Sequence, residues 1–310
     1  MTDTDQQSAQ GNDPVRGSIY MALAMLSFAV NDAIIKYIGV TMPVGELLFV
    51  RGVFTIIIIG AICWYVGALH ALPQLLSRPV AWRAVADVAT TYLFITALLN
   101  LPLANANSIL QAVPFLVIVL ATVFLGERVG WRRFSAVAVG FAGVLLIVRP
   151  GGSDFNVYSL YAMAALVTVA ARDIITRRIP AKVPSMIVAL ANALAVTVGG
   201  LAWGLYTGFE PLDGRQLGYL WASAMMIAAA YSFMVLTIRT ADVASSAPMR
   251  YTMVPWSILF GYLVFGDVPD LLAFAGMALI ALSGVYALNR EAKLRKSGEN
   301  VTHVSKKYRW

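Results

Sequence analysis

Ten stretches of mostly apolar residues, separated by short segments rich in turn formers, dominate this sequence. A helix needs about 20 predominantly apolar residues to cross the hydrocarbon core of a bilayer. The stretches are continuous rather than alternating, unlike the strands of a membrane barrel. We expect helices at roughly 18–38, 46–66, 82–100, 104–125, 131–149, 157–178, 184–206, 217–239, 247–266 and 269–289. The chain is therefore predicted to be an all-α polytopic membrane protein with ten transmembrane helices.

The composition excludes several other classes of protein. Hydrophobic residues make up 59% of the 310 residues and charged residues only 13%, whereas soluble domains carry about 25% charged residues. A soluble chain of this size cannot bury so much apolar surface, so a soluble enzyme, a disordered protein and a disulfide scaffold are excluded. The single cysteine, Cys63, and the two distant histidines, His70 and His303, show no metal-ligand spacing. We expect neither a metal nor a cofactor.

The basic residues predict the orientation of the chain. With a cytoplasmic N-terminus, 17 of the 23 Lys and Arg residues fall on the cytoplasmic side, three on the outer side and three within helices. Cytoplasmic loops carry the excess of Lys and Arg, so both termini are predicted to be cytoplasmic. The net charge of +7 is then mainly a topology signal, which argues against a nucleic-acid partner. Residues 1–16 are expected to form a disordered tail and residues 291–310 a basic tail.

The two halves of the chain resemble each other at a shift of 141 residues. Asn31–Lys36 aligns with Arg172–Arg177, and Val-Pro pairs in the fourth and ninth segments align as well. Each half holds five predicted helices, an odd number, so the halves would cross the membrane in opposite senses. We predict two inverted repeats, 17–150 and 157–290. Many secondary transporters have this architecture, with a site between the repeats, although a channel or a membrane enzyme can also be duplicated.

Several segments within residues 16–290 resemble the ten-helix drug/metabolite transporter superfamily, which is built from two EamA-type repeats. The supporting segments are Asn31-Asp32 with Lys36-Tyr37, Glu46 with Arg51, residues 113–115 and 124–127, residues 131–144, and Ala247-Pro248-Met249-Arg250-Tyr251. The last segment, with the Asn-Asp and Glu/Arg patterns, is similar to the branch that contains bacterial S-adenosylmethionine uptake proteins. Riboflavin importers belong to the same superfamily.

This resemblance implies a function and a location. The chain is expected to be a secondary transporter that moves a small vitamin- or nucleoside-like metabolite across the bacterial inner membrane by alternating access. The alternative is an exporter of amino acids or drugs with the same fold. The fifth and tenth segments carry almost no buried charge, so they are predicted to be peripheral and are the candidate contact of a homodimer.

Charged residues inside the membrane are costly and usually face a cavity or a partner. Asp32 and Lys36 lie four residues apart on one face of the first helix, and Asp173 with Arg177 repeats this spacing in the sixth. We expect the first pair at an outer gate and the second at an inner gate. The alternative is that both are local ion pairs near helix ends.

Three further charged residues are candidates for gating or coupling. Glu46 and Arg51 are five residues apart, on different faces of one helix, so Arg51 is expected to find a partner across helices, such as Asp32 or Glu46. Asp87 is either a proton-coupling carboxylate or the local partner of Arg83.

A substrate cavity is expected between the two repeats. Pro114 and Pro255 can bend the fourth and ninth helices and free backbone carbonyl groups there. The candidate substrate-binding residues supply cations, amides and aromatic faces; they are Arg250, Tyr251, Trp256, Gln111, Asn107, Arg172, Tyr92 and Tyr231. For the aromatic residues, the alternative is a place in the interfacial belt.

Other mechanisms receive little support from the sequence. No Gly-x4-Gly-Lys-Ser/Thr run is present, so ATP binding of that kind is not expected. Coupling would come from a proton, an exchanged solute or the gradient of the substrate itself. No His-Glu-x-x-His or Gly-x-Ser-x-Gly motif supports an intramembrane enzyme. The mixed signs of the intramembrane charges favour a gated site over the ring of like charges expected of a channel.

Overall fold

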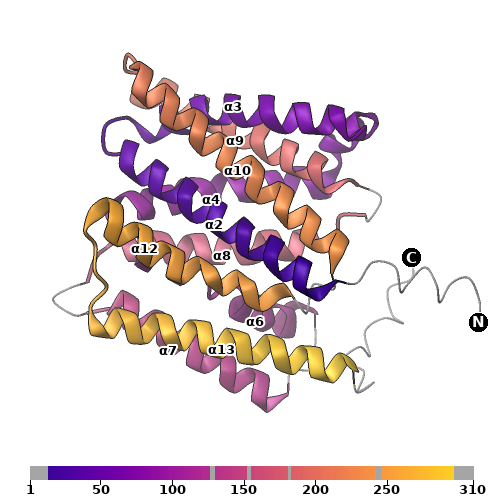
Figure 1. The fold of residues 1–310 in the computed structure, drawn as a ribbon, viewed down its shortest axis with the longest axis vertical. Coiled ribbons are helices and arrows are strands. Elements are labelled where there is room, and N and C mark those ends of the chain that lie inside the picture. The colour runs from indigo at the N-terminus through magenta and orange to yellow at the C-terminus, as the bar shows by residue number, and fades with distance from the viewer. Residues whose placement is uncertain (1–12, 126–129, 152–154, 181–182, 242–245, 297–310) are drawn as a thin grey trace, which may run out of the picture.

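The computed structural model describes residues 13–125, 130–151, 155–180, 183–241 and 246–296. These residues form an all-helical bundle (Figure 1). Its elements are α2 (Pro14–Ile38), α3 (Val44–Tyr65), η1 (Ala68–Leu76), α4 (Arg78–Asn100), α5 (Leu103–Leu110), α6 (Val113–Leu125), α7 (Trp131–Val148), α8 (Tyr158–Thr176), α9 (Ser185–Thr207), α10 (Gly214–Thr240), η2 (Ala247–Thr252), α12 (Met253–Phe265) and α13 (Leu271–Lys296).

Ten segments of the described chain cross the bundle, as the apolar stretches predicted. Eight spans are long and apolar enough to cross a membrane. The other two crossings are α7, with the shorter apolar run Phe134–Val148, and the pair η2 and α12. Of the predicted tails, residues 1–12 and 297–310 lie outside the described residues. Between them, α2 starts at Pro14 and α13 continues to Lys296.

The fourth and ninth crossings are not the continuous helices that the sequence predicted. The fourth is divided into α5 and α6 at Gln111 and Ala112, and the ninth into η2 and α12 at Thr252 and Met253. These two breaks differ by 141 residues, the offset of the internal repeat. A proline follows each break within the first turn of the next helix, where its missing N–H costs no helical hydrogen bond.

The helix pairings show the two-fold relation between the repeats. The most extensive pairings join α2 to α10, α8 to α4, α3 to α9 and α7 to α13. If each helix is replaced by its counterpart in the other repeat, the pairing of α2 with α10 becomes that of α8 with α4. The pairings of α3 with α9 and of α7 with α13 are unchanged. In Figure 1, α3 and α9 lie at one end of the bundle and α7 and α13 at the other, with the remaining helices between them.

Glycines allow the closest of these pairings. A Cβ atom on Gly143 of α7 would lie 2.7 Å from the carbonyl oxygen of Gly276 of α13, and one on Gly276 would lie 2.6 Å from that of Gly143. A Cβ atom on Gly45 of α3 would lie 2.4 Å from the backbone nitrogen of Gly204 of α9. Small residues that allow backbones to approach are typical of helix packing in membranes. The α7–α13 and α3–α9 pairs are therefore tightly packed, and they lie on either side of the central helices.

Candidate functional site

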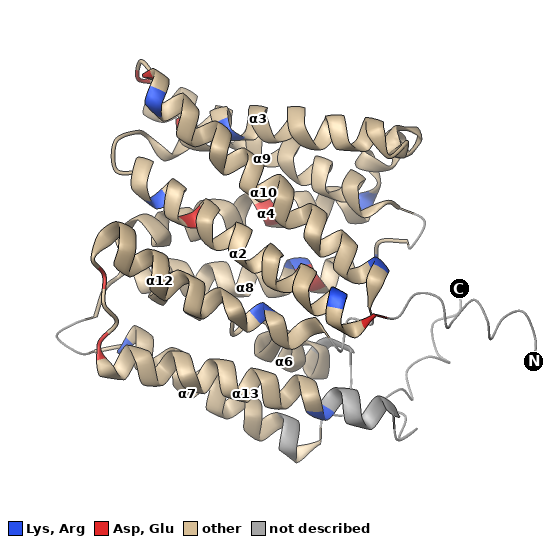
Figure 2. Ribbon diagram, viewed as in Figure 1, with Lys and Arg blue, Asp and Glu red and all other residues tan. Residues whose placement is uncertain are grey.

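Two faces of the bundle serve as reference. The terminal face carries the start of α2 and the end of α13, at the right in Figure 1, and the distal face carries the α2–α3 and α12–α13 connections. Charged residues are sparse on the helices between these faces (Figure 2). Most of those within the bundle fall into a central cluster, a cluster near the terminal face and a contact near the distal face.

The central cluster consists of buried polar residues from five helices. It comprises Asn31, Asp32, Arg51, Asn107, Ser223 and Ser257, each at most 6% exposed. Asn31 Nδ2 donates to Asp32 Oδ1 at 3.0 Å, and Ser223 Oγ donates to Asn31 Oδ1 at 2.7 Å. Asn107 Nδ2 donates to Ser257 Oγ at 3.0 Å, and the Asn107 amide also faces the Asp32 carboxylate. The cluster thus connects α2 to α5, α10 and α12.

Arg51 has Asp32, one of its two expected partners, as an electrostatic neighbour, whereas Glu46 has a backbone partner. The Arg51 guanidinium interacts electrostatically with Asp32, but within the described residues it forms neither an ion pair nor a hydrogen bond. Glu46 is 2% exposed, and its Oε2 accepts a hydrogen bond of 3.1 Å from the backbone N–H of Glu210. Glu46 therefore anchors the α9–α10 connection to the start of α3.

A second group of charges, the Asp87 cluster, lies near the terminal face. Asp87 accepts from Arg83 Nη1 at 2.7 Å and from Arg172 Nη1 at 3.1 Å, while Arg172 Nη2 lies 2.9 Å from Asp173 Oδ1. Arg83 Nε also donates to Thr176 Oγ1 at 3.0 Å. The expected local pair of Asp87 with Arg83 is therefore present, and it is part of a network joining α4 to α8.

This network changes two expectations. Arg172, a predicted substrate ligand, is already bound by two carboxylates, so its guanidinium is occupied in this conformation. The ion pair of Asp173 is with its neighbour Arg172, and Arg177 lies at the C-terminal cap of α8. The Asp87 cluster thus includes Asp173 of the pair predicted in the sixth helix, with a different set of partners.

The contact near the distal face is centred on Lys36. Lys36 Nζ donates to the carbonyl oxygen of Leu101, lies 3.6 Å from Asp267 Oδ2, and sits 5.2 Å from the centre of the Phe265 ring. It therefore joins the end of α2 to the α4–α5 and α12–α13 connections. The expected local pair with Asp32 is not formed, because Asp32 belongs to the central cluster. We call this contact the distal closure.

The two helix breaks touch each other. Gln111 Nε2, at the break between α5 and α6, donates to the carbonyl oxygen of Arg250 in η2 at 2.6 Å. The side-chain amide of Gln111 in the first repeat thus binds a backbone carbonyl of the second repeat, in a segment that is not regular α-helix. Interrupted helices at corresponding positions of inverted repeats are a strong indicator of a transport site.

Several predicted aromatic ligands pack against other helices instead of facing the central cluster. Tyr251 is buried against α13, where a Cβ atom on Gly284 would lie 1.8 Å from the Tyr251 hydroxyl oxygen. Trp256 stacks on Phe260 with ring centres 6.4 Å apart, and the ring centres of Tyr92 and Trp203 are 4.7 Å apart. These contacts are packing.

Tyr231 of α10 lies closer to the polar groups. Its hydroxyl accepts from Asn192 Nδ2 at 3.0 Å, and its ring meets Phe28 edge-on at 5.9 Å. It is electrostatically coupled to Arg51 and also to the Asp87 cluster. Tyr231 therefore lies between the two groups of charges.

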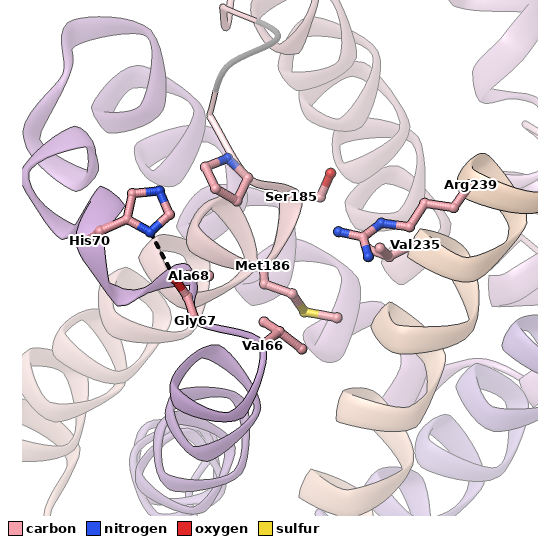
Figure 3. A pocket seen from close by; sticks show the side chains of 9 residues that line it. Val66, Gly67, Ala68, His70, Ser185, Met186, Val235 and Arg239 are labelled. Carbon is pink, nitrogen blue, oxygen red and sulfur yellow. Dashed lines mark hydrogen bonds between the residues drawn. The ribbon is translucent and has the colours of Figure 1, made fainter. Parts of the chain in front are cut away.

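A cavity of about 220 Å³ lies near the terminal face, and none of the predicted ligands is among its lining residues (Figure 3). It is bounded by the end of α3, η1, the start of α9 and the end of α10, and its lining includes His70, Met186 and Arg239. His70 Nδ1 is 2.7 Å from the carbonyl oxygen of Gly67. Across the described chain, no group of three metal-ligating side chains is found.

Some members of these clusters were not predicted. Asn31 adjoins Asp32 in the repeated motif, and Asp267 belongs to the Gly-Asp pair that aligns with Gly126-Glu127, so both had a detectable signal. Glu127 lies outside the described residues. Ser223 and Ser257 carried no signal, because a serine in an apolar helix commonly bonds to its own backbone.

Comparison with known proteins identifies the family. The EamA-like transporter family matches residues 15–149 and again residues 156–290. The chain belongs to the EamA-like transporter family. It is thus a membrane transporter built from two EamA repeats, as the resemblance in the sequence implied.

The relatives of this EamA protein differ in cargo and direction. It is 24% identical to an S-adenosylmethionine uptake transporter of Rickettsia prowazekii, over 91% of this chain and 96% of the relative. It is 27% identical to the pseudopaline exporter CntI of Pseudomonas aeruginosa, over 89% and 97%, and 27% identical to a riboflavin transporter of Rhizobium johnstonii, over 94% and 98%. A solved crystal structure shares the fold, with a TM-score of 0.64 at 19% identity, over 90% of this chain and 98% of the other.

Proposed function

We propose that this protein takes up a small vitamin- or nucleoside-like metabolite, such as S-adenosylmethionine or riboflavin, across the bacterial inner membrane by alternating access. In this proposal both termini lie in the cytoplasm, as the distribution of basic residues predicts. The observation that carries the proposal is the contact of Gln111 with the Arg250 carbonyl, where the interrupted helices of the two repeats meet.

The charged contacts fit an alternating-access cycle. The distal closure joins α2 to the α4–α5 and α12–α13 connections, and the Asp87 cluster joins α4 to α8 near the other face. The central cluster lies between them and includes Asn107, a predicted ligand. In this proposal the two outer groups break in turn, and each exposes the central cluster to one side of the membrane.

Export of a related metabolite is the second candidate, because one relative is named as an exporter. Uptake and export are separated by measuring radiolabelled S-adenosylmethionine and riboflavin in right-side-out and inverted vesicles from cells that express the protein. Saturable entry into right-side-out vesicles above that of vector controls supports uptake. Saturable entry into inverted vesicles alone supports export, and a non-saturating ionic conductance would refute a carrier.

A further inference from the structure

Arg51 is a buried charged residue whose guanidinium forms no ion pair or hydrogen bond with the described residues. Arg51 is 94% buried, since its relative exposure is 6%. A guanidinium keeps its charge and presents five N–H donors in a fixed plane. Among the residues that the structure describes, none of these donors makes a hydrogen bond or an ion pair, whereas Lys36, Asp87 and Arg172 all have named partners. An unpaired charge at this depth indicates a functional site.

Asp32 is the complementary group. It is 6% exposed, its neighbours are the amides of Asn31 and Asn107, and no cation of the described chain forms an ion pair with it. Asp32 and Arg51 are near enough for each charge to act on the other, yet they do not meet. A buried carboxylate and a buried guanidinium are thus held apart in the same polar region.

Helix α10 packs beside both charges. It packs against both α2, which carries Asp32, and α3, which carries Arg51. It also contributes Ser223, which is bonded to Asn31, and Tyr231, which is electrostatically coupled to Arg51. Both charges therefore lie on helices that pack against α10, and a ligand that carries both complementary charges can satisfy both groups at once.

We propose that Asp32 and Arg51 bind the charged head group of a zwitterionic α-amino acid. Arg51 binds the carboxylate through paired N–H donors, and Asp32 binds the ammonium group. In such a ligand the carboxylate and the ammonium group are attached to a single carbon atom, so one head group carries the charges complementary to both side chains. The proposal rests on the function proposed above, because this ligand is the transported solute.

The remainder of the solute is placed beside aromatic surface. Phe28 lies one turn before Asp32 on α2, and its ring meets that of Tyr231 edge-on at 5.9 Å. Aromatic faces suit an apolar or planar side group. A neutral flavin leaves both buried charges unpaired, and a molecule with one charge leaves one of them unpaired. Such mismatches are strongly rejected by sites built from buried polar groups.

The test measures binding to the purified full-length protein in lipid nanodiscs. The probes are S-adenosylmethionine, its decarboxylated analogue, its deaminated analogue, and 5′-methylthioadenosine, which lacks the whole head group; the 20 standard amino acids and riboflavin complete the panel. We expect at least one zwitterion to bind, and we expect loss of its carboxylate or ammonium group to weaken binding about 100-fold. If only riboflavin or other compounds without an α-amino acid head group bind, the assignment is overturned while transport itself stands.

Single substitutions test which side chain binds which charged group of the ligand. Arg51→Gln should weaken binding of the zwitterion about 100-fold and abolish discrimination against the ligand without a carboxylate. Asp32→Asn should do the same for the ligand without an ammonium group. Arg239→Gln, at the exposed end of α10, is the matched control and should leave both affinities unchanged.

The variants also exclude a purely structural role for the two charges. If Arg51→Gln does not fold, Arg51→Lys keeps the positive charge and should retain part of the carboxylate discrimination. Discrimination that is unchanged in the Arg51 and Asp32 variants would refute the assignment. Absence of both binding and transport for every compound, with correctly folded protein, would count against the proposed function as well.

Discussion

Replacement of Lys36 by methionine should open the distal face. Methionine keeps most of the length of the side chain but removes its charge and its three donors. In the structure, Lys36 Nζ contacts the Leu101 carbonyl oxygen, the Asp267 carboxylate and the Phe265 ring. The three contacts join α2 to the α4–α5 connection, the α12–α13 connection and the end of α12, so all three are lost when the face opens.

The magnitude follows from these contacts. A hydrogen bond from a charged donor is worth about 1.5–3 kcal/mol, a cation–π contact about 0.5–1 kcal/mol, and a partly exposed ion pair about 0.2–1 kcal/mol. The Asp267 side chain is 34% exposed, which places the ion pair at the low end of its range. A total of about 3 kcal/mol changes the equilibrium between closed and open states by about 100-fold.

Distance measurements between spin labels test this prediction. Val40 and Val268 lie in the two distal connections, and each is 73% exposed. Cys63 is the only cysteine, so Cys63→Ala gives a background in which labels can be attached at Val40→Cys and Val268→Cys. The parent protein should give one short distance, and Lys36→Met should add a longer one as the main population.

A matched control separates opening from general loss of charge at this face. Asp270→Asn removes the ion pair between Arg149 and Asp270, which joins α7 and α13 at the distal face. It should leave the distance between the labels unchanged, because these two helices stay packed through their glycines. An identical distance distribution in Lys36→Met and the parent would refute the role given to the distal closure.

Three further predictions concern stability. Asp87→Asn should lower the free energy of unfolding by about 3–5 kcal/mol in denaturant titrations, because it leaves two partly buried guanidinium groups without their shared carboxylate. Asp173→Asn should lower the free energy of unfolding by less, because the Asp173 side chain is 31% exposed. Gly143→Ala should lower the free energy of unfolding by about 1–3 kcal/mol, because the new Cβ atom would lie 2.7 Å from a backbone oxygen of α13. The Cβ atom of Gly60→Ala would meet nothing within 4 Å, so this variant should raise the free energy of unfolding by up to about 1 kcal/mol. Hydrogen bonds from the Arg149 side chain and the Ala273 N–H hold the pKa of Asp270 below its ordinary value of 3.8, so its contribution to stability is complete above about pH 5 and is lost as the pH falls through the lowered pKa.

Each of these predictions has a contradicting result. Equal losses for Asp87→Asn and Asp173→Asn would show that the Asp87 cluster is not a buried network. A Gly143→Ala variant as stable as the Gly60→Ala variant would show that α7 and α13 do not approach as described. For Asp270→Asn, the melting temperature should fall less steeply than that of the parent between pH 5 and pH 3, and parallel curves would contradict the lowered pKa.

The sequence predicted the membrane architecture because that architecture rests on one strong physical requirement. Backbone polar groups in a bilayer must be satisfied within the segment, so long apolar runs form helices. The breaks at Gln111 and Thr252 were not predicted as interruptions, although Pro114 and Pro255 pointed to bends there. A break depends on what the neighbouring helix offers the freed backbone groups, and Gln111 supplies one such contact from the other repeat.

The candidate site was only partly predictable for a related reason. Spacing along one helix identified Asp32 and Lys36 as neighbours on one face, but in the structure Asp32 meets the amides of Asn31 and Asn107, and Lys36 meets Asp267 of the α12–α13 connection. The same holds for Arg172, whose bond to Asp87 crosses from α8 to α4. Local spacing identifies which side chains can meet within a helix. It does not identify which helices lie side by side, and in a bundle of inverted repeats those contacts determine the partners.

Counterflow in proteoliposomes tests the central claim, a carrier that exposes one site to each side of the membrane in turn. Vesicles that contain the purified protein are loaded with unlabelled S-adenosylmethionine or riboflavin and diluted into a trace of the same radiolabelled compound. For the transported compound, the account predicts transient accumulation of label above the equilibrium level, which disappears without the internal load. Entry of label at the same rate with and without internal load, proportional to concentration over the whole range, would contradict it.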